Sequence, residues 1–179
     1  QNFLIFDVLV QNCYESGIVG KSSGVGYAAQ NKVIASWVLD NRIYGIKLGP
    51  TGTTVGWVID SNHIARNGQG AGAGEAAGIL LDNSSQNIIS NNMIWENSKT
   101  AAGRGILLKA AGDNHIVDNY SDADGLVAFI ELATAGCNEN VILGNSSKDF
   151  GHPGTAGIGI LITVGDRNVI VGNKLFGAA

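Results

Sequence analysis

Four carboxylic acids lie near one repeated position of the chain: Glu96 and Asp149 occupy it, and Asp122 and Asp124 flank it in the repeat between them. Most glycoside hydrolases use two carboxyl groups, one as an acid and the other as a base or nucleophile. If the chain forms stacked coils, carboxylates one coil apart would lie about 5 Å from each other and those two coils apart about 10 Å, which brackets the two known geometries. We therefore predict these four as candidate catalytic residues. The alternative interpretation is a solvated acidic face.

Side chains suited to holding a sugar lie near these acids in the sequence. Aromatic rings pack on the C–H faces of sugars, and a polysaccharide lyase would need a strong base such as an arginine. The predicted substrate-binding residues are Arg66, Glu75, Trp95, Arg104, Tyr120 and His152.

Metal binding is a further possibility for the acidic residues. They could hold Ca²⁺, which takes several oxygen ligands, although no calcium-specific spacing is present. No transition-metal site is predicted, because His63 and His115 fall in different coils without a third ligand. Cys13 and Cys137 would lie roughly 20 Å apart, too far to form a disulfide, and are interpreted as small buried residues.

The elements that would position these residues are seven copies of one six-residue frame. The copies start at residues 2, 32, 57, 87, 114, 140 and 168, and their third residue is always Leu or Ile. Each is followed by a second short stretch, a loop of variable length and a third run such as Gly-Ile-Leu-Leu at 78–81. Three β-type runs per repeat, with no competing helical periodicity, indicate a β-solenoid, in which stacking buries what one unit cannot.

Asparagines mark the ends of many frames. Asn tolerates left-handed backbone geometry at turns, and its amide can bond to the same amide one coil above and below. One predicted ladder contains Asn62, Asn92, Asn119, Asn145 and Asn173; the other contains Asn87, Asn114, Asn140 and Asn168. Trp37 and Asp7 would interrupt the first ladder, and Trp37 and Trp57, at frame positions normally held by Asn, are assigned packing roles.

The repeats vary mainly at one corner. Loops lengthen at residues 68–77, 98–104 and 146–156, between the second and third runs. Insertions at one corner of a solenoid emerge along one side and commonly form its binding face. We expect the functional site on that side.

These Asn-rich repeats resemble the right-handed parallel β-helix proteins of the pectate-lyase-like superfamily, including carbohydrate-binding and sugar-hydrolase repeats and phage tailspikes. The resemblance implies an all-β, single-stranded parallel β-helix of about seven coils of 25–30 residues, with three short strands per coil, in one domain over 1–179. The superfamily holds lyases, hydrolases, epimerases and non-enzymatic surface proteins. The paired aspartates and Gly-His-Gly of polygalacturonases are missing, because Phe150-Gly151-His152-Pro153 is only superficially similar.

Composition limits the partners. A net charge of −4 with 15% charged residues provides no basic field for nucleic acid. No apolar run is long enough to span a membrane. Because neither end looks capped, we expect a piece of a longer chain or a homo-oligomer, either a trimer or a filament.

The sequence favours an extracellular or virion-surface β-helix that recognises a polysaccharide. Degradation of that glycan by hydrolysis or elimination is left open. The alternative is a non-enzymatic structural shaft or filament subunit. A uronate epimerase is a weaker third possibility, because the Tyr/His/Asp grouping it needs cannot be assembled.

Overall fold

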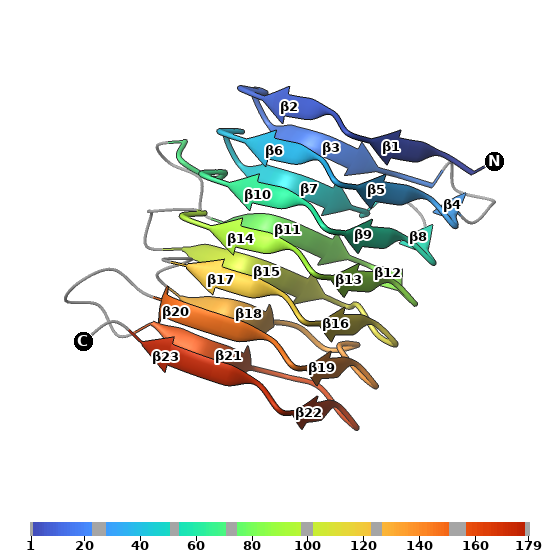
Figure 1. Cartoon of the computed structure of the whole chain (residues 1–179). Helices are drawn as coiled ribbons and strands as arrows, with labels where there is room; N and C mark the ends of the chain where they lie inside the picture. The colour runs from blue at the N-terminus through green and yellow to red at the C-terminus, as the bar shows by residue number, and fades with distance from the viewer. Residues whose placement is uncertain are drawn as a thin grey trace.

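The computed structural model describes residues 2–22, 28–50, 54–70, 75–97, 102–122, 127–150 and 157–177. These residues form only strands and connecting turns, which stack from one end of the molecule to the other (Figure 1). Every strand pairing is parallel, and each sheet takes one strand from each successive repeat. The chain is a parallel β-helix, as the repeats predict. No helix in these ranges is long and apolar enough to cross a membrane.

Three long sheets form the sides of the stack. Sheet A contains β1 (Leu4–Phe6), β5 (Lys32–Ile34), β9 (Val58–Asp60), β13 (Ile88–Ser90), β16 (His115–Val117), β19 (Val141–Leu143) and β22 (Val169–Val171). Sheet B contains β2 (Leu9–Gln11), β6 (Trp37–Leu39), β10 (His63–Ala65), β14 (Met93–Trp95), β17 (Tyr120–Asp122), β20 (Ser146–Phe150) and β23 (Lys174–Gly177). Sheet C contains β3 (Ser16–Gly20), β7 (Tyr44–Leu48), β11 (Ala76–Asp82), β15 (Gly103–Lys109), β18 (Ala128–Leu132) and β21 (Ile158–Ile162).

A fourth, smaller sheet was not expected from the sequence. It contains β4 (Ala28–Ala29), β8 (Thr54–Val55) and β12 (Ser84–Ser85), and it continues the turn between sheets C and A in three neighbouring coils. Within it the Thr54 hydroxyl donates to Oγ of Ser84 at 2.5 Å. Small hydroxyl side chains can therefore replace apolar ones at this corner.

The interior is filled by columns of aliphatic side chains. Side chains along a strand alternate between the two faces, so the middle residue of each three-residue strand points inward. The fully buried inner columns include Val33, Ile59, Ile89, Ile116 and Ile142 of sheet A, Val38, Ile64 and Ile94 of sheet B, and Ile46, Ile79, Ile106 and Ile130 of sheet C. The outward positions of sheets A and B are consequently free to carry function.

Asparagine ladders hold the coils in register. At Asn92, Oδ1 accepts from the backbone N–H and the side-chain amide of Asn62, both at 3.0 Å. Its own Nδ2 donates to Oδ1 of Asn119 and to the carbonyl of Ile59, both at 2.9 Å. Asn114 makes the equivalent contacts to Asn87 and Asn140. Both predicted ladders are confirmed, and every member from Asn62 to Asn145 is buried.

A third ladder was missed in the sequence. Asn41, Asn67 and Asn97 follow the strands of sheet B and repeat the same bonds, with Asn41 Nδ2 donating to Oδ1 of Asn67 at 2.8 Å. This ladder explains the recurring Gly-Ile runs. A Cβ on Gly45 would lie 2.8 Å from Nδ2 of Asn67, so only glycine fits beside the amide column.

The predicted register is wrong by one residue in the first two coils. Leu4 pairs with Lys32 and Lys32 with Val58, so the second frame begins at Asn31 rather than Lys32. Ser36 therefore continues the ladder, and its backbone N–H donates to Oδ1 of Asn62 at 2.9 Å. Trp37 and Asp7 are not ladder positions. A shift of one residue reverses the face of every side chain, which accounts for the error at Trp37.

Candidate functional site

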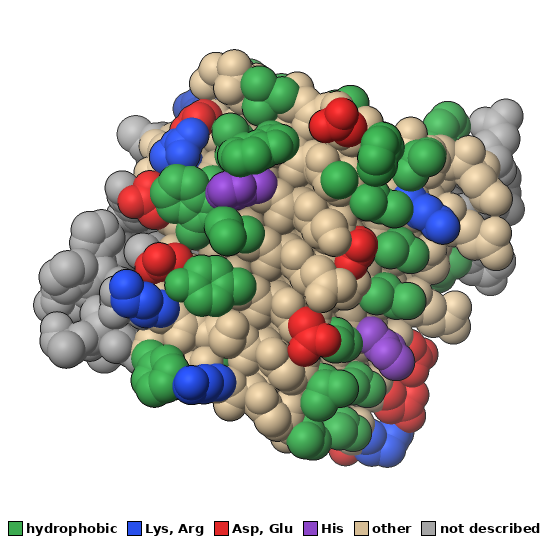
Figure 2. Space-filling model, in the orientation of Figure 1, with side chains coloured by type: hydrophobic (Ala, Val, Ile, Leu, Met, Phe, Trp, Pro, Cys, Tyr) green, Lys and Arg blue, Asp and Glu red, His purple; other side chains and the backbone are tan. Residues whose placement is uncertain are grey.

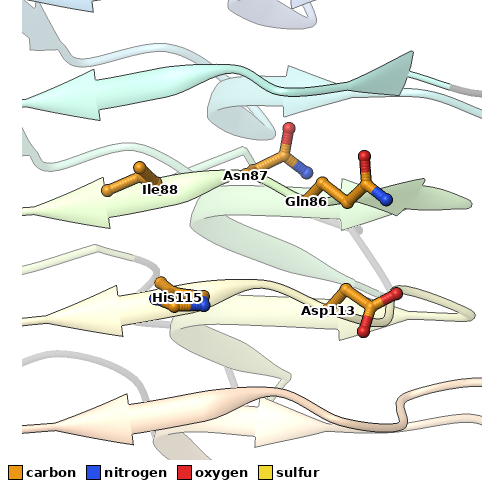
Figure 3. A pocket seen from close by; sticks show the side chains of 5 residues that line it. All are labelled: Gln86, Asn87, Ile88, Asp113 and His115. Carbon is orange, nitrogen blue, oxygen red and sulfur yellow. The ribbon is translucent and has the colours of Figure 1, made fainter.

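Two hollows lie over the Asn ladders on the outside of the stack. We define the Trp37 hollow by Ala35, Ser36, Trp37, Ser61, Asn62, His63, Asn91 and Met93, with a volume of about 300 Å³. We define the Gln86 hollow by Gln86, Asn87, Ile88, Asp113 and His115, with a volume of about 440 Å³ (Figure 3). In both, a buried ladder Asn forms the floor, between a turn residue and the first outward residue of the next strand.

The turn side of each hollow has left-handed backbone geometry. Ala35, Ser61 and Asn91 have φ of 49°, 56° and 53°, and Gln86 and Asp113 have φ of 57° and 55°. These residues complete the sharp corner before each ladder position, where Asn and other short polar residues are tolerated. Apart from Ala35, these residues have exposed polar side chains, so each corner supplies a polar wall.

The strand side of the Trp37 hollow is aromatic. Trp37, His63 and Met93 are register neighbours in sheet B, and the column continues with Tyr120. The rings of Trp37 and His63 stack with centroids 4.3 Å apart and planes inclined by 23°. The indole Nε1–H of Trp95, two residues along the next strand, donates to Nε2 of His63. Figure 2 shows a histidine among hydrophobic side chains over sheet B.

This aromatic column is exposed at both ends. Trp37 retains 49% of its accessible surface, Met93 46% and Tyr120 37%. The predicted packing role of Trp37 is wrong, whereas that of Trp57, which is 6% exposed, is confirmed. Exposed aromatic side chains on a flat sheet are suited to binding a partner with an apolar face.

Arg66 lies beside the Trp95 ring at the edge of this column and is held in place by Asp40. Nε and one terminal nitrogen of Arg66 each donate to Asp40, both at 2.8 Å. This bidentate hydrogen bond raises the pKa of Arg66, whose guanidinium lies 5.3 Å from the Trp95 ring centroid. Burial, and then the positive charge of Arg66, lower the pKa of His63. The imidazole is therefore neutral at pH 7.

Asp60 supplies negative charge at the turn between sheet A and sheet B. Burial pulls its pKa upward, but hydrogen bonds from Ser90, Asn91 and Ser61 outweigh burial and leave the pKa below the ordinary value. The shortest, from the Ser90 hydroxyl, is 2.6 Å. Asp60 is thus ionised at neutral pH beside the polar wall of the Trp37 hollow.

The predicted catalytic residues are brought together only in part. Glu96 follows β14 and Asp122 ends β17, and the Glu96 backbone N–H donates to the Asp122 carbonyl at 3.0 Å. Glu96 also shares a column with Arg66, as the repeat spacing predicts. Asp124 and the side chain of Asp149 lie outside the described residues. The structure therefore brings the backbones of two of the four residues, Glu96 and Asp122, side by side at the end of sheet B.

Glu75 and Arg104 lie elsewhere, against sheet C. Nε of Arg104 donates to Oε2 of Glu131 at 2.5 Å, and Glu75 accepts from the Tyr44 hydroxyl at 3.0 Å and pairs with Lys109 at 3.4 Å. Their grouping with Trp95 and Tyr120 is not borne out by these contacts. These contacts involve β7, β15 and β18, beside a small cluster that contains Tyr44, Leu80 and Leu107. Burial raises the pKa of Tyr44, and the Glu75 carboxylate adds to that shift.

The remaining predicted binding residues divide between two outcomes. Trp95 and Tyr120 both lie on the outer side of sheet B, and their role in binding a substrate stays a prediction. His152 lies outside the described residues. Sequence reasoning missed Trp37, His63 and Met93 as site residues. The usable signal was position, since His63 and Met93 each follow a ladder Asn directly and must therefore point outward.

The Gln86 hollow has the same construction with a different wall. Its strand side is Ile88 over His115, and its turn side is Gln86 over Asp113 (Figure 3). The column continues through Val58, Val141 and Val169, and between Val58 and Val169 it is aliphatic except at His115. It has no stacked aromatic pair among the described residues.

The described residues contain no grouping of side chains that is typical of a metal site. No three or more His, Cys, Asp or Glu side chains there converge on one point. Ca²⁺, which needs several oxygen ligands, therefore gains no support. Cys13 and Cys137 are both free, as expected from their separation. The sulfur nearest to a histidine in register is that of Met93, beside His63.

Comparison with known families identifies a matching family model. The family model described as "Periplasmic copper-binding protein (NosD)" matches residues 7–178. Neither a curated protein nor a solved structure matches the chain significantly. The pectate-lyase-like and tailspike resemblances thus hold for the β-helix only. Because the family model covers nearly the whole chain, the protein belongs to the NosD family of β-helix proteins.

Proposed function

We propose that the protein recognises a polysaccharide that lies along the outer side of sheet B and in the Trp37 hollow. The observation that carries this proposal is the continuous column of Trp37, His63, Met93 and Tyr120 over four successive coils, with Trp95 beside it. Coils repeat every 4.8 Å or so, so the column presents the rings of Trp37, His63 and Tyr120, with the Met93 thioether between the last two, at the regular spacing of a polymer.

The polar wall complements the rings. Sugars combine apolar C–H faces with hydroxyl groups, so they need aromatic surface and hydrogen-bonding groups together. Ser61 and Asn91 line the hollow opposite His63 and Met93. Asp60 and Asp122 add negative charge on either side. This charge favours a neutral or amine-bearing glycan over a uronate, because like charges repel across a binding site.

Catalysis is the less supported half of the proposal. Glu96 and Asp122 are neighbours at the edge of the column and would be the acid–base pair of a hydrolase. We propose recognition as the function and Glu96→Gln with Asp122→Asn as the test of hydrolysis. If wild-type protein releases no reducing ends from any glycan that it binds, the hydrolase proposal is wrong.

The family description supports a proposal for where the protein acts. The family is described as periplasmic, and cell-envelope glycans are accessible there. We propose the periplasm or cell exterior as the location.

Binding to a panel of immobilised oligosaccharides, followed by calorimetry on the hits, tests recognition directly. We expect at least one neutral or amino-sugar polymer to bind. Trp37→Ala should weaken that binding, whereas Ile88→Ala in the Gln86 hollow should not. Loss of binding in both variants, or in neither, would contradict the proposed location.

A second candidate function is structural, as a subunit of a homo-oligomer. The outward columns of sheet A are largely aliphatic and exposed, including Ile88, Leu143, Val169 and Val171. Extended apolar surfaces of this kind commonly bind a partner. Sedimentation of the protein would test self-association, and Leu143→Lys should dissociate any oligomer formed through this face.

Copper, which the family description implies, fits the described residues in only one oxidation state. Cu(II) prefers several nitrogen or oxygen ligands, and no such grouping is found in the described ranges. Cu(I) accepts thioether sulfur and imidazole nitrogen. Met93 and His63 provide one of each as register neighbours. Bound there, copper would supply a soft, singly charged centre on the outer side of sheet B.

A further inference from the structure

The third asparagine ladder contains the one Asn-Gly pair of the sequence, Asn67-Gly68. In an unfolded chain, the backbone nitrogen that follows an asparagine can attack the side-chain amide carbon, Cγ, and close a cyclic imide. Glycine hinders this attack least, because it has no Cβ and its backbone adopts the widest range of conformations. Asn67 is therefore the asparagine of this chain that reacts fastest once the chain is unfolded.

The fold holds the Asn67 amide at both of its polar atoms. Oδ1 accepts from the backbone N–H of Asn41 at 3.1 Å and from the Asn41 side-chain amide at 2.8 Å. Nδ2, the group that the reaction would release, donates to the carbonyl of Val38 and to Oδ1 of Asn97, both at 2.9 Å. The side chain is fully buried. The amide cannot turn its carbon toward the next backbone nitrogen without breaking these hydrogen bonds.

The attacking nitrogen is held as firmly as the amide. The backbone N–H of Gly68 donates to the carbonyl of Asn41 at 2.8 Å, and Gly68 has a positive φ of 81°. This nitrogen is therefore bonded to the preceding coil rather than directed at Cγ of Asn67. Gly68 is also buried, so a base in the solvent cannot reach its proton. Both reacting groups become available only when the coils around them open.

We propose that Asn67 is a site of deamidation that is closed in the folded stack and opens when these coils unfold. In the open chain, the nitrogen of Gly68 bonds to Cγ of Asn67, and the Cγ–Nδ2 bond breaks. The proton of the Gly68 nitrogen leaves with Nδ2 as ammonia. Water then hydrolyses the imide at either carbonyl and leaves aspartate or isoaspartate at position 67. Water is the only co-reactant, and nothing is oxidised or reduced.

The modified residue no longer fits the ladder. Aspartate places a carboxylate oxygen where Nδ2 donates, facing the carbonyl oxygen of Val38 and Oδ1 of Asn97. A buried negative charge that meets two acceptors is strongly unfavourable. Isoaspartate lengthens the backbone and moves the following coil out of register. A molecule that has stayed unfolded therefore loses the ability to re-form this coil, which makes its unfolding irreversible.

Peptide mapping by mass spectrometry tests the protection of Asn67. The protein is incubated at mildly alkaline pH, either folded or unfolded in guanidinium chloride, and deamidation of the peptide that contains Asn67 is followed with time. We expect the unfolded chain to react faster by about a hundredfold or more, because native proteins are unfolded in about one molecule in a thousand or fewer. Asn97 is the internal reference, since it stands in the same ladder but precedes a serine. It should react more slowly than Asn67 in the unfolded sample.

Refolding tests the consequence of the modification. After incubation in denaturant, the wild-type protein is diluted into buffer, and refolded and misfolded molecules are separated by size-exclusion chromatography and mapped. We expect chains modified at Asn67 to collect in the fraction that fails to refold. Asn67→Asp should lower the urea midpoint, whereas Asn83→Asp makes the same change at an exposed turn and should keep the wild-type midpoint.

Gly68→Asn separates ring closure from other damage. Asparagine tolerates positive φ, but its side chain hinders the attack on Asn67. This variant should therefore keep its capacity to refold through an incubation that inactivates the wild type. The proposal is overturned if Asn67 reacts as fast in the folded protein as in the unfolded chain, or if modified wild-type chains refold as completely as unmodified ones. Neither outcome depends on a glycan, because none is present.

Discussion

The Trp37 hollow and the Gln86 hollow are built from the same structural parts. Each has a floor of buried ladder asparagine, a turn residue of positive φ on one side and an outward strand residue on the other. Beyond their turn residues, they differ in the column of outward strand residues. Trp37, His63 and Met93 line one, and Val58, Ile88 and His115 occupy the equivalent column of the other.

This difference separates what builds the fold from what gives it a function. The ladders need Asn at the floor of both hollows, because the amides connect successive coils. The outward strand side chains do not connect successive coils, so they can change without disturbing the stack. Chemistry in this β-helix therefore depends on which outward column has become aromatic.

The largest expected effect is on stability and should be equal in the two hollows. Asn92→Ala and Asn114→Ala each leave a backbone N–H and a carbonyl of neighbouring coils without partners inside the stack. Each unsatisfied group costs about 1 to 3 kcal/mol, so we expect each variant to lose about 3 to 5 kcal/mol in urea unfolding.

Asn91→Gly is the control for these ladder variants. It removes an exposed amide at the adjacent turn, where glycine accepts the positive φ of 53°. Its loss should stay below about 1 kcal/mol. If Asn92→Ala cost no more than this control, the ladder would not be the main constraint on register.

The next effect distinguishes the hollows by binding. Trp37→Ala removes the ring that stacks on His63 and should weaken affinity for a bound glycan by about tenfold, because an aromatic contact contributes about 1.5 kcal/mol. Ile88→Ala should leave calorimetric affinity unchanged. Equal losses would show that glycan contacts both hollows.

A smaller effect depends on pH and on His63 alone. Because its pKa is lowered in the folded protein, the unfolded chain binds its proton first as the pH falls through about 6.5. Wild-type stability should therefore fall relative to His63→Gln between about pH 7.5 and about pH 5.5. A difference between the two proteins that stays constant over this range would be inconsistent with the buried, neutral ring.

The smallest effect concerns the edge of the aromatic column. Arg66→Met breaks the pair with Asp40, in which both side chains are 35% exposed. Half-exposed ion pairs contribute little, so the free energy of unfolding should fall by less than about 1 kcal/mol. A loss above about 2 kcal/mol would assign Arg66 a structural role comparable to a ladder asparagine.

The sequence predicted the fold well because the spacing of the repeated frames indicates stacked parallel strands. Asn87, Asn114 and Asn140 recur with an inward Ile two residues later, and this pattern needs only parallel stacking to be satisfied. The first two coils lack the final Asn of the frame, so the second frame can be aligned on Lys32, with Ile34 inward, or on Asn31, with Val33 inward; the structure has the second alignment. That one-residue ambiguity reversed the predicted side of Trp37.

The site was predicted less well for two physical reasons. The expected grouping assumed that Glu75 and Arg104 share a side with Trp95, whereas these residues begin the strands of sheet C, beyond a loop whose path repeats do not determine. The His63–Met93 pairing depends on register between coils of different length. That register becomes visible only when the ladders on either side are aligned.

The most direct test of the account uses the three tryptophan indole N–H resonances of the protein during titration with a glycan that binds. Trp37 and Trp95 lie on the outer side of sheet B, whereas Trp57 is buried at a ladder position and serves as an internal control. We predict that the Trp37 and Trp95 resonances shift together and that the Trp57 resonance stays in place. Saturable binding that leaves both outer resonances unmoved, or that moves the His115 ring resonances instead, would contradict the account.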